Sequence, residues 1–581
     1  MLLQALTRSL ATASLLLSYV DAVPTLGKSS CKNIPGDHAW PTSVEWDQLN
    51  QTVSGQLIGT IPLAIVCHID SYDNYNETAC AALQAVWDLP ATHSPYSGEI
   101  DSAWFQNDSC VPFTPASQPC ELGNYVSYSI NVTGANDVIA GLQFAEEKNV
   151  RLVIKNTGHD FLGKSTGKGG LGLWMHNLKT TEYISNYKSS YYNGAALKIG
   201  AGITGAEAYT AAHQYGCRLV GGECPTVGLA GGYTQGGGHS LLNSVYGMGA
   251  DNALEWEVVT AQGQHLVATP TQNADLYWAL SGGGGGTYGV VLSLTTRLYQ
   301  DGEVGGAALY FNATLVSNET FWAGIEAWHT ALATIVDAGI VAIYELVGST
   351  FSSPSITAPG MNATQVAAQF APFLASLDKL GIPYSFVPRT SATYFDHFSQ
   401  DFGPLPGGSY PASMIENSRL IPRATLLDPE GNAAVVKAMQ TTVASGDFLL
   451  GCNAINVGAG GNFSRSDYPD NAVLPYWRDA MVVCLMIGMW DWDVPRSNME
   501  ARESELINVI TPAFQAASGS GAYLNEASFK TPDWQEQFYG TNYDRLRAIK
   551  KKYDPNDLFY AVTAVGSDAW VTDSAGRLCR A

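Results

Sequence analysis

The run Gly221-Gly-Glu-Cys224-Pro-Thr-Val-Gly-Leu-Ala-Gly-Gly-Tyr-Thr-Gln-Gly-Gly-Gly-His239 is the largest glycine cluster of the chain. A shorter loop, Asn156-Thr-Gly-His159-Asp-Phe-Leu-Gly163, follows the apolar stretch Arg151–Lys155. Glycines reach positive φ angles easily, and successive glycines expose backbone N–H groups in a concave nest that binds anions. The two loops therefore predict a site for a cofactor that contains a pyrophosphate.

Three short patterns in the glycine-rich regions match other nucleotide-site or catalytic motifs. Residues 158–165 fit the phosphate-binding loop of nucleotide hydrolases, 163–167 the serine elbow of hydrolases, and 167–172 and 284–289 the dinucleotide fingerprint. Each motif must lead into a helix, which holds the phosphate or supports the serine. Here more glycines or an apolar strand follow. The context therefore disfavours all three functions.

The composition excludes further classes of protein. The 581 residues include 30 Lys and Arg against 52 Asp and Glu, a formal net charge of −22, and the only dense basic run is 550–552. Nucleic-acid binding depends on clustered cations, so we expect no nucleic-acid partner. Hydrophobic residues make up 46%, which excludes a disordered chain. The length predicts more than one core.

The N-terminus resembles a secretory signal. Arg8 precedes the largely apolar stretch 10–20, which is too short for a membrane anchor, and Ala22 provides a small residue at the cleavage position. We expect a secreted, extracellular, glycosylated monomer without a membrane anchor. The glycan acceptors with the Asn-x-Ser/Thr pattern are Asn50, Asn76, Asn107, Asn131, Asn312, Asn318, Asn362 and Asn462.

An oxidising compartment permits disulfides among the ten cysteines. The short spacings predict two local bridges, Cys67–Cys80 and Cys110–Cys120. Cys31 and Cys579 form a further possible pair. Among the other cysteines, Cys217, Cys452 and Cys484 have no evident partner in the sequence.

The pattern of apolar residues divides the chain into four parts after the leader at 1–22. Residues 23–120 form an extension with little periodicity, and 121–303 alternate short strands and helices. Residues 304–520 predict one sheet with helices on one face, and 521–581 return to a compact pattern. The clearest predicted elements are helices at 205–214, 274–280, 319–333, 364–380 and 542–552, and strands at 125–132, 151–155, 172–175, 197–201, 218–220, 253–260, 290–298, 340–347, 448–457 and 481–490.

Two side chains within the glycine-rich loops have both a structural and a functional interpretation. His159 is either a loop histidine bonded locally or a group that acts on the cofactor. Cys224 is either a disulfide partner or a sulfur that Pro225, by favouring an extended backbone before it, directs outward. The two residues do not show the spacing of zinc ligands, so we expect no metal.

Taken together, the motifs resemble the FAD-linked oxidases of the vanillyl-alcohol oxidase superfamily, specifically the secreted fungal branch similar to berberine bridge enzymes and oligosaccharide oxidases. The resemblance covers residues 121–298 and 533–570. It rests on elements that occur in the family's order: Lys155-Asn-Thr-Gly-His159-Asp, Gly222-Glu-Cys224-Pro-Thr-Val-Gly228, Gly236-Gly-Gly-His239-Ser, Tyr246-Gly-Met-Gly-Ala-Asp251-Asn, Asp275-Leu-Tyr-Trp-Ala-Leu, the run 282–289, Tyr539-Gly-Thr-Asn542-Tyr543-Asp-Arg-Leu546 and Tyr553-Asp-Pro555.

This resemblance implies an α+β fold with three components. They are a PCMH-type FAD-binding domain of two subdomains at 121–303, an α/β substrate domain at 304–520 whose sheet roofs the flavin, and a C-terminal segment at 521–581 that returns to the FAD domain. It also implies FAD attached through His159 to the 8α-methyl and through Cys224 to C6. The other implied cofactor contacts are Asn156, Thr157, Gly158, Asp160, Gly163, Ser165, Thr226, Val227, Gly228, Gly231, Gly232, Gly289, Val290, Asn542 and Tyr543.

The expected activity is an oxidase that moves a hydride from an oxygenated carbon, such as an alcohol or lactol, to FAD and then reduces O2 to H2O2. A base that removes the hydroxyl proton assists such a step. Tyr476 and Glu416 are the two candidates, each weighed against an ordinary packed or surface position. One alternative is a secondary-metabolite cyclase or dehydrogenase of the same superfamily. Another is a secreted binding protein that retains flavin without catalysis.

Overall fold

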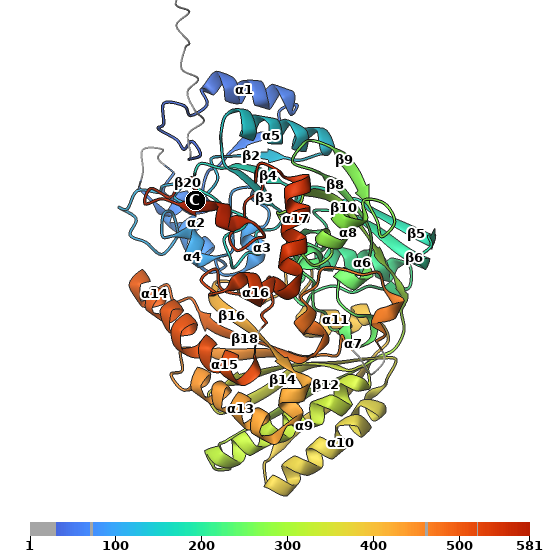
Figure 1. The fold of residues 1–581 in the computed structure, drawn as a ribbon. Helices are drawn as coiled ribbons and strands as arrows, with labels where there is room; N and C mark the ends of the chain where they lie inside the picture. The colour runs from blue at the N-terminus through green and yellow to red at the C-terminus, as the bar shows by residue number, and fades with distance from the viewer. Residues whose placement is uncertain (1–30, 70–73, 459–462, 520) are drawn as a thin grey trace, which may run out of the picture.

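The computed structural model describes residues 31–69, 74–458, 463–519 and 521–581. The expected leader at 1–22 and the glycan acceptor Asn462 lie outside these ranges. Within them, no helix combines the length and the apolar character needed to span a membrane. The fold is α+β, as the sequence predicted, and contains three main sheets. Figure 1 shows a large sheet with its helices in the lower half of the molecule and the two smaller sheets above it.

The first small sheet ends at the loop that carries His159. Its strand order is β1-β2-β4-β3, with β4 parallel to both β2 and β3. The helix α5 (Ala135–Glu147) covers it with Val138, Leu142 and Ala145, which are all buried. The strands are β1 (Leu57–Gly59), β2 (Tyr128–Asn131), β3 (Leu152–Lys155) and β4 (Leu171–Trp174).

The second small sheet is antiparallel, in the order β5-β6-β10-β8-β9. Helix α6 (Gly205–Gln214) begins at a capping box, in which Thr204 and Glu207 satisfy each other's backbone N–H groups. The remaining elements are β5 (Thr181–Lys188), β6 (Asn193–Gly200), β8 (Ala253–Val259), β9 (His265–Ala268), β10 (Val290–Arg297), α7 (Asn243–Tyr246), α8 (Ala274–Leu280) and the short pair β7 (Cys217–Arg218) and β11 (Tyr299–Gln300).

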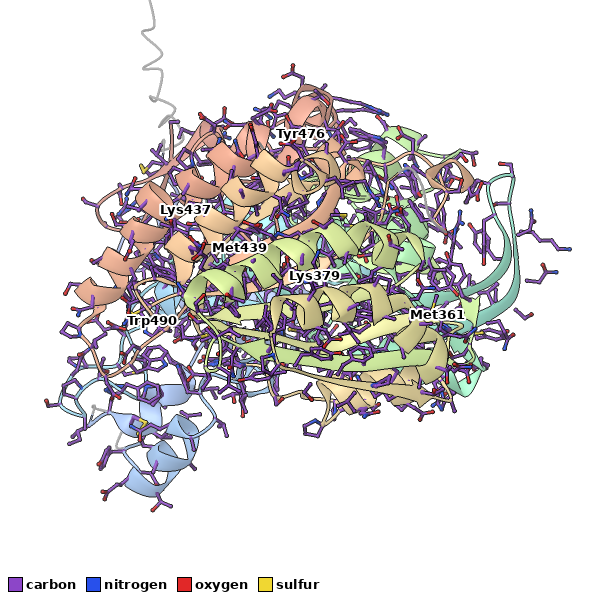
Figure 2. All side chains as sticks on the ribbon, turned by 90° about the horizontal axis from the view of Figure 1, so that it is seen from below. Met361, Lys379, Lys437, Met439, Tyr476 and Trp490 are labelled. Atoms are coloured by element: carbon purple, nitrogen blue, oxygen red, sulfur yellow. A yellow bond between two sulfur atoms is a disulfide. The ribbon has the colours of Figure 1, made fainter. Side chains whose placement is uncertain are left out.

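The large sheet has seven antiparallel strands in the order β15-β12-β14-β13-β17-β18-β16. Helices cover one face, where Lys379 of α10 and Lys437 of α13 are labelled in Figure 2. The strands are β12 (Val304–Asn312), β13 (Val341–Val347), β14 (Thr350–Pro359), β15 (Tyr384–Ser391), β16 (Met414–Pro422), β17 (Leu449–Ala454) and β18 (Ala480–Met489). The helices are α9 (Asn318–Asp337), α10 (Ala363–Leu380), α11 (Tyr394–Phe402), α12 (Arg423–Leu427), α13 (Pro429–Val443), α14 (Arg496–Glu505) and α15 (Thr511–Ser518).

The two ends of the chain complete the upper half. The N-terminal extension adds β1 to the first sheet, and the C-terminal segment places α17 against α8. The buried Lys550 ammonium donates to the Thr287 carbonyl at 3.0 Å and to Asp554, which fixes α17 beside a glycine-rich loop. The elements are α1 (Ser43–Thr52), α2 (Glu77–Gln84), α3 (Pro90–His93), α4 (Ala103–Gln106), α16 (Trp534–Tyr539), α17 (Tyr543–Tyr553), β19 (Trp570–Thr572) and β20 (Leu578–Arg580).

Four disulfides are present among the described residues. The predicted local bridges Cys67–Cys80 and Cys110–Cys120 are confirmed, as is the possible bridge Cys31–Cys579. The fourth joins Cys452 to Cys484, which face each other on β17 and β18. No local pattern indicated this bridge, because the two cysteines are neighbours only across the sheet. Cys217 and Cys224 remain free thiols.

A buried ion pair joins the upper half to the loop that precedes β18. Asp251 is fully buried, and both of its carboxylate oxygens accept hydrogen bonds from Arg478, at 2.8 and 2.9 Å. The Asn471 amide also donates to it at 2.7 Å. Burial alone would raise the pKa of Asp251, but Arg478 and then Arg465 lower it below its usual value. The pair therefore helps to fix the two halves relative to each other.

We expect Asp251→Asn to lower the free energy of unfolding by about 3 kcal/mol, because it leaves the Arg478 guanidinium without its buried counter-charge. Urea denaturation monitored by tryptophan fluorescence measures this loss. The control is Asp470→Asn, whose carboxylate is 77% exposed in a neighbouring ion pair, and which should change stability by less than about 0.5 kcal/mol. Equal effects of the two substitutions would contradict the assigned role of Asp251.

Candidate functional site

The loop after β3 has a fixed shape. The Asp160 carboxylate accepts hydrogen bonds from the backbone N–H groups of Leu162 and Ser165. Gly158 and Gly163 have φ angles of +96° and +77°, which side chains other than glycine rarely adopt. A Cβ atom at Gly163 would also lie 2.5 Å from the Phe105 ring. The local geometry therefore requires both glycines and directs the loop toward the centre of the molecule.

The second glycine-rich loop packs against the first through Asn156. Cβ atoms at Gly228 and Gly231 would lie 2.7 and 2.8 Å from the Asn156 side-chain nitrogen. That nitrogen donates to the Ala201 carbonyl, whereas the side-chain oxygen of Asn156 is buried without a partner. Because Gly228 and Gly231 have no side chains, the two loops can approach each other. The Asn156 side-chain oxygen remains available as an acceptor for a ligand.

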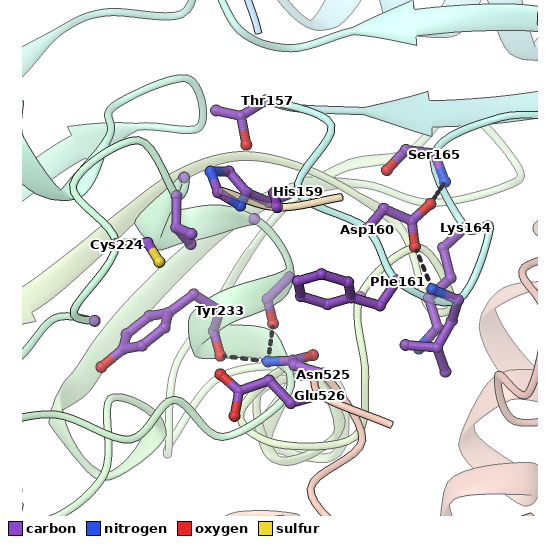
Figure 3. A pocket seen from close by; sticks show the side chains of 18 of the residues that line it. Thr157, His159, Asp160, Phe161, Lys164, Ser165, Cys224, Tyr233, Asn525 and Glu526 are labelled. Carbon is purple, nitrogen blue, oxygen red and sulfur yellow. Dashed lines mark hydrogen bonds between the residues drawn. The ribbon is translucent and has the colours of Figure 1, made fainter. Parts of the chain in front are cut away.

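A cavity of about 330 Å³ lies between these loops, the C-terminal segment and the exposed face of the large sheet. This volume is within the range of ligand sites, about 300–1,000 Å³. Figure 3 shows the loop residues His159 and Cys224 on one side, with Asn525 and Glu526 on another. The sheet contributes Ile343, Glu345, Met414, Glu416, Gly451, Asn453, Leu485 and Ile487.

His159 has a polar group at each ring nitrogen. Its Nε2 lies 2.6 Å from the Thr226 hydroxyl, and its Nδ1 lies 3.5 Å from the Asp101 carboxylate. Asp101 comes from the N-terminal extension, is 2% exposed, and has no hydrogen-bond partner for either oxygen. Burial lowers the pKa of His159 despite the opposing effect of Asp101. The ring is therefore held in one orientation and is kept neutral and nucleophilic.

Cys224 is a free, partly buried thiol on the cavity wall. Burial raises its pKa, and the nearby Glu223 carboxylate raises it further. The thiol is therefore protonated at neutral pH and is protected from ordinary oxidation, which proceeds through the thiolate. Its reaction with a ligand must be accompanied by removal of the proton.

A cluster of carboxyl groups surrounds His239 at the other side of the cavity. Its Nδ1 lies 3.5 Å from Glu223 and its Nε2 lies 3.0 Å from Glu526. Burial would lower the pKa of His239, but Glu526 and then Glu223 raise it to about 9. Burial raises the pKa of Glu223 to about 7. At neutral pH the imidazole is therefore a cation between two acids.

Glu416 faces the cavity from β16. It is 4% exposed, and one of its oxygens is buried without a hydrogen-bond partner. Burial, followed by the charge of Glu526, raises its pKa well above the usual value of a glutamate. A group of this kind can exchange a proton with a ligand, because no protein group occupies its free oxygen.

The structure brings eleven of the predicted cofactor contacts, and Glu416, to this cavity. Among the others, Thr226 contacts His159 behind the cavity wall, and Gly163 shapes the loop without lining the cavity. The cavity-lining predicted contacts are Asn156, Thr157, Gly158, His159, Asp160, Ser165, Cys224, Val227, Gly228, Gly231 and Gly232.

Five predicted residues are not part of the lining of this cavity. Gly289 packs against Val258, Val290 is in the core, and the Asn542 amide donates to the carbonyls of Ala472 and Val473. The Tyr543 hydroxyl accepts a hydrogen bond from the Gly566 N–H. Tyr476, labelled in Figure 2, donates its hydroxyl proton to Glu536 at 2.7 Å in an exposed contact outside the cavity.

Sequence reasoning missed several polar residues that line the cavity, and also Asp101, which contacts His159 without lining the cavity. Asp101 belongs to a segment without periodicity, and Glu526 follows a short loop in the C-terminal segment, so neither had a local signal. Glu223 and His239 did have a local signal, because both lie within the quoted motifs. Glu223 directly precedes Cys224, and His239 follows Gly236-Gly-Gly. Tyr410 and Asn453 are brought in only by the folding of the large sheet and its connections.

Comparisons with known proteins identify the family. A family model described as "FAD binding domain" matches residues 127–269, and one described as "Berberine and berberine like" matches residues 522–566. A bifunctional decalin synthase from Penicillium decumbens is 50% identical over 575 residues, which is 97% of this chain and 99% of the relative. A VAO-type flavoprotein oxidase from Thermothelomyces thermophilus is 50% identical over 95% of this chain and 96% of its own.

The chain belongs to the berberine-bridge-like, VAO-type family of FAD-linked oxidoreductases. Solved structures agree with this assignment. The crystal structure of a VAO-type flavoprotein from Myceliophthora thermophila has a TM-score of 0.92 at 50% identity and covers 95% of this chain and 100% of its own. A glucooligosaccharide oxidase from Acremonium strictum shares the fold, with a TM-score of 0.61 at 19% identity over 76% of this chain and 91% of its own.

The cavity fits the FAD that this family binds. Gly232 and Gly286 have open space where a Cβ atom would lie, so a ligand can approach their backbone closely. The unpartnered Asn156 oxygen supplies an acceptor, and Lys164, whose pKa burial lowers to about 8, supplies a cation for a diphosphate. Apolar walls come from Leu152, Ile154, Val227 and Phe559.

The raised pKa of His239 predicts a pH-dependent contribution to stability. Protonation of His239 stabilises the folded state fully below about pH 6.5, its ordinary pKa, and this contribution is lost as the pH rises through about 9. We therefore expect wild type to be more stable than His239→Gln at pH 6, with a difference that shrinks between pH 7 and 10. Thermal unfolding across this range measures it. A difference that stays constant with pH would contradict the charged state assigned to His239.

Proposed function

We propose that this protein is a secreted oxidase that removes a hydride from an oxygenated carbon, an alcohol or lactol, and forms H2O2. The observation that carries the proposal is one cavity with two nucleophiles, His159 and Cys224, on its loop side and an unpartnered acid, Glu416, on its sheet side. When bound, FAD would supply the hydride acceptor and the route of the electrons to O2. The protein's residues attach it, orient the substrate and exchange the proton.

The attachment of FAD through both His159 and Cys224 is part of this proposal. Thr226 and Asp101 orient the imidazole, and neutral imidazole and thiolate are the side chains able to add to an electron-poor ring system. The glucooligosaccharide oxidase from Acremonium strictum is described as carrying a 6-S-cysteinyl, 8α-N1-histidyl FAD. Permanent attachment suits an exported enzyme, because a dissociated cofactor would be lost by dilution.

Glu416 is the proposed base. A substrate hydroxyl that donates to its free oxygen would lose its proton while the neighbouring carbon loses the hydride. The His239 cation pairs with Glu526, and its positive charge offsets one of the negative charges of the carboxyl cluster near Glu416. Because the pKa of Glu416 is raised, ionisation of this residue requires a higher pH than an ordinary glutamate does.

Secretion and glycosylation are part of this proposal. The four disulfides require an oxidising compartment, and the seven acceptor asparagines within the described residues are all partly or fully exposed. The eighth acceptor, Asn462, is proposed from its sequence pattern alone.

Oxidative ring closure of a secondary metabolite is the second candidate function. It is favoured by the 50% identity to a bifunctional decalin synthase, and hydride removal by the same cavity would generate the electrophile for closure. A screen of sugars, alcohols and phenols for H2O2 separates the two. Peroxide formed with a member of the screen supports the oxidase, whereas cyclisation of a polyketide without oxidation of any screen member supports the alternative.

We expect acid-precipitated wild-type protein to retain yellow flavin in the pellet. His159→Ala and Cys224→Ala should each keep one covalent bond, so that the intact mass of each still includes FAD, and the double variant should release it. Cys217→Ala is the matched control, since Cys217 is a free buried thiol that does not line the cavity. Flavin found in the supernatant of wild type would refute covalent attachment.

We expect Glu416→Gln to lower kcat by about 10²–10⁴-fold, the usual contribution of a general base, without releasing the flavin. In wild type, the acidic limb of the kcat profile should lie above the range of an ordinary glutamate, because activity appears only as Glu416 ionises. The control is Glu345→Gln, which removes another carboxyl group that lines the cavity. If both variants lose activity equally, Glu416 is not the specific base.

A further inference from the structure

A second, outer compartment of about 570 Å³ adjoins the large sheet where it meets the N-terminal extension. Trp490, one of its residues, is labelled in Figure 2 at the boundary between the sheet region and the extension drawn in blue. The extension contributes Gln84, Asp88 and Phe113. The sheet and its connections contribute Val347, Gly446, Asp447, Phe448, Leu449, Ile487, Met489, Trp490, Asp491, Trp492, Asp493 and Arg502.

The outer compartment lies next to the cavity that His159 and Glu416 line, here called the inner cavity, along one face of the large sheet. Ile487 of β18 lines both spaces. On β13, Glu345 lines the inner cavity and Val347, two residues further, lines the outer compartment. On β17, Gly451 lines the inner cavity and Leu449 lines the outer compartment. Alternate residues of a strand point to the same face and are about 7 Å apart. The two compartments are therefore adjacent on the same face of the sheet and share Ile487 as part of their walls.

The sheet side of the outer compartment is apolar and incompletely covered. Val347 is 53% exposed and Met489 is 37% exposed, although both lie on strands of the main sheet. On the opposite side, the Phe113 ring stacks on Trp492 with the centroids 4.8 Å apart. Apolar side chains and aromatic rings on facing walls are suited to a hydrocarbon chain or a flat ring.

Charges at the edge of this compartment select against anions. Its lining includes four carboxylates and one guanidinium. Arg502 pairs with Asp447 at 2.9 Å, and Asp88 accepts a hydrogen bond from the Trp492 indole at 2.9 Å. Asp491 and Asp493 add negative charge without a cationic partner in the lining. A ligand that ends in a carboxylate would be repelled here.

We propose that the outer compartment is the binding site for the distal part of the enzyme's own substrate, which is an elongated, uncharged molecule with a hydroxylated end and a hydrocarbon tail. The inference rests on the proposed function, since it places the hydroxylated end beside Glu416. The tail lies over Ile487 and between Met489, Val347 and the Phe113–Trp492 pair. The choice of occupant rests on the position of the outer compartment beside the inner cavity, on the same face of the sheet and with Ile487 in both linings, not on the apolar surface alone.

The test uses flavin-loaded enzyme and a series of 4-alkylbenzyl alcohols, from methyl to octyl. Binding is measured without oxygen by the change in absorption of flavin already reduced with dithionite, because reduced flavin cannot accept a hydride and the signal then does not depend on turnover. Each added methylene that enters the outer compartment should lower Kd by about threefold to fourfold, the value for burial of one CH2 group. A matched alcohol whose tail ends in a carboxylate should bind more weakly than its neutral counterpart. This difference in Kd should be largest at low salt, where charges are least screened.

Met489→Asp should weaken binding progressively as the tail lengthens. The control is Val387→Asp, an equally charged change at a residue of β15 that is 58% exposed and lines neither compartment. A Kd that does not depend on tail length, an equal effect of both variants, or no binding by any member would overturn the proposal. If Kd falls with tail length but none of the alcohols is oxidised, the outer binding site is supported and the proposed oxidase activity is refuted.

Discussion

The close approach of the two glycine-rich loops is the constraint on which the cofactor site depends. The Asn156 side chain occupies the space that Cβ atoms at Gly228 and Gly231 would need. Any larger residue at either position would push apart the loops that carry His159 and Cys224. The two nucleophiles belong to loops that follow different sheets, so their common orientation toward one cavity depends on this contact more than on either sheet by itself.

The other side of the site depends on how the large sheet is held in place. Asp251 and Arg478 join the halves of the molecule through a buried pair, and Asn525 brings the C-terminal segment against the carbonyls of Gly232 and Tyr233. These contacts place Glu416 and Glu526 opposite the loops. The proposed base Glu416 would be effective only when held within hydrogen-bonding reach of its substrate, so these interfaces outside the cavity would contribute to the proposed chemistry.

Much of the fold could be predicted from the sequence where local signals agreed. The helices at 205–214 and 274–280 have the predicted bounds, and the apolar strands near 153, 256 and 294 are present. β5 was missed because its burial pattern is mostly exposed, and β12 because Gly305 and Gly306 interrupt its apolar pattern. The loop half of the site carried motifs. Its acidic half did not, since Glu416 and Glu526 come together only through long-range packing.

The N-terminal extension shows why a segment without periodicity can still determine function. It contains only short elements, yet it adds β1 to a sheet, brings Asp101 to His159, and supplies Phe113 to the outer compartment. Each role needs one side chain or strand at one place, so no repeating pattern is required. In the proposed arrangement, the inner cavity holds the reacting groups and the outer compartment holds the tail of the substrate. The glycine-rich loops and glutamates would then preserve one chemistry, while changes in the extension would alter the tail that is accepted.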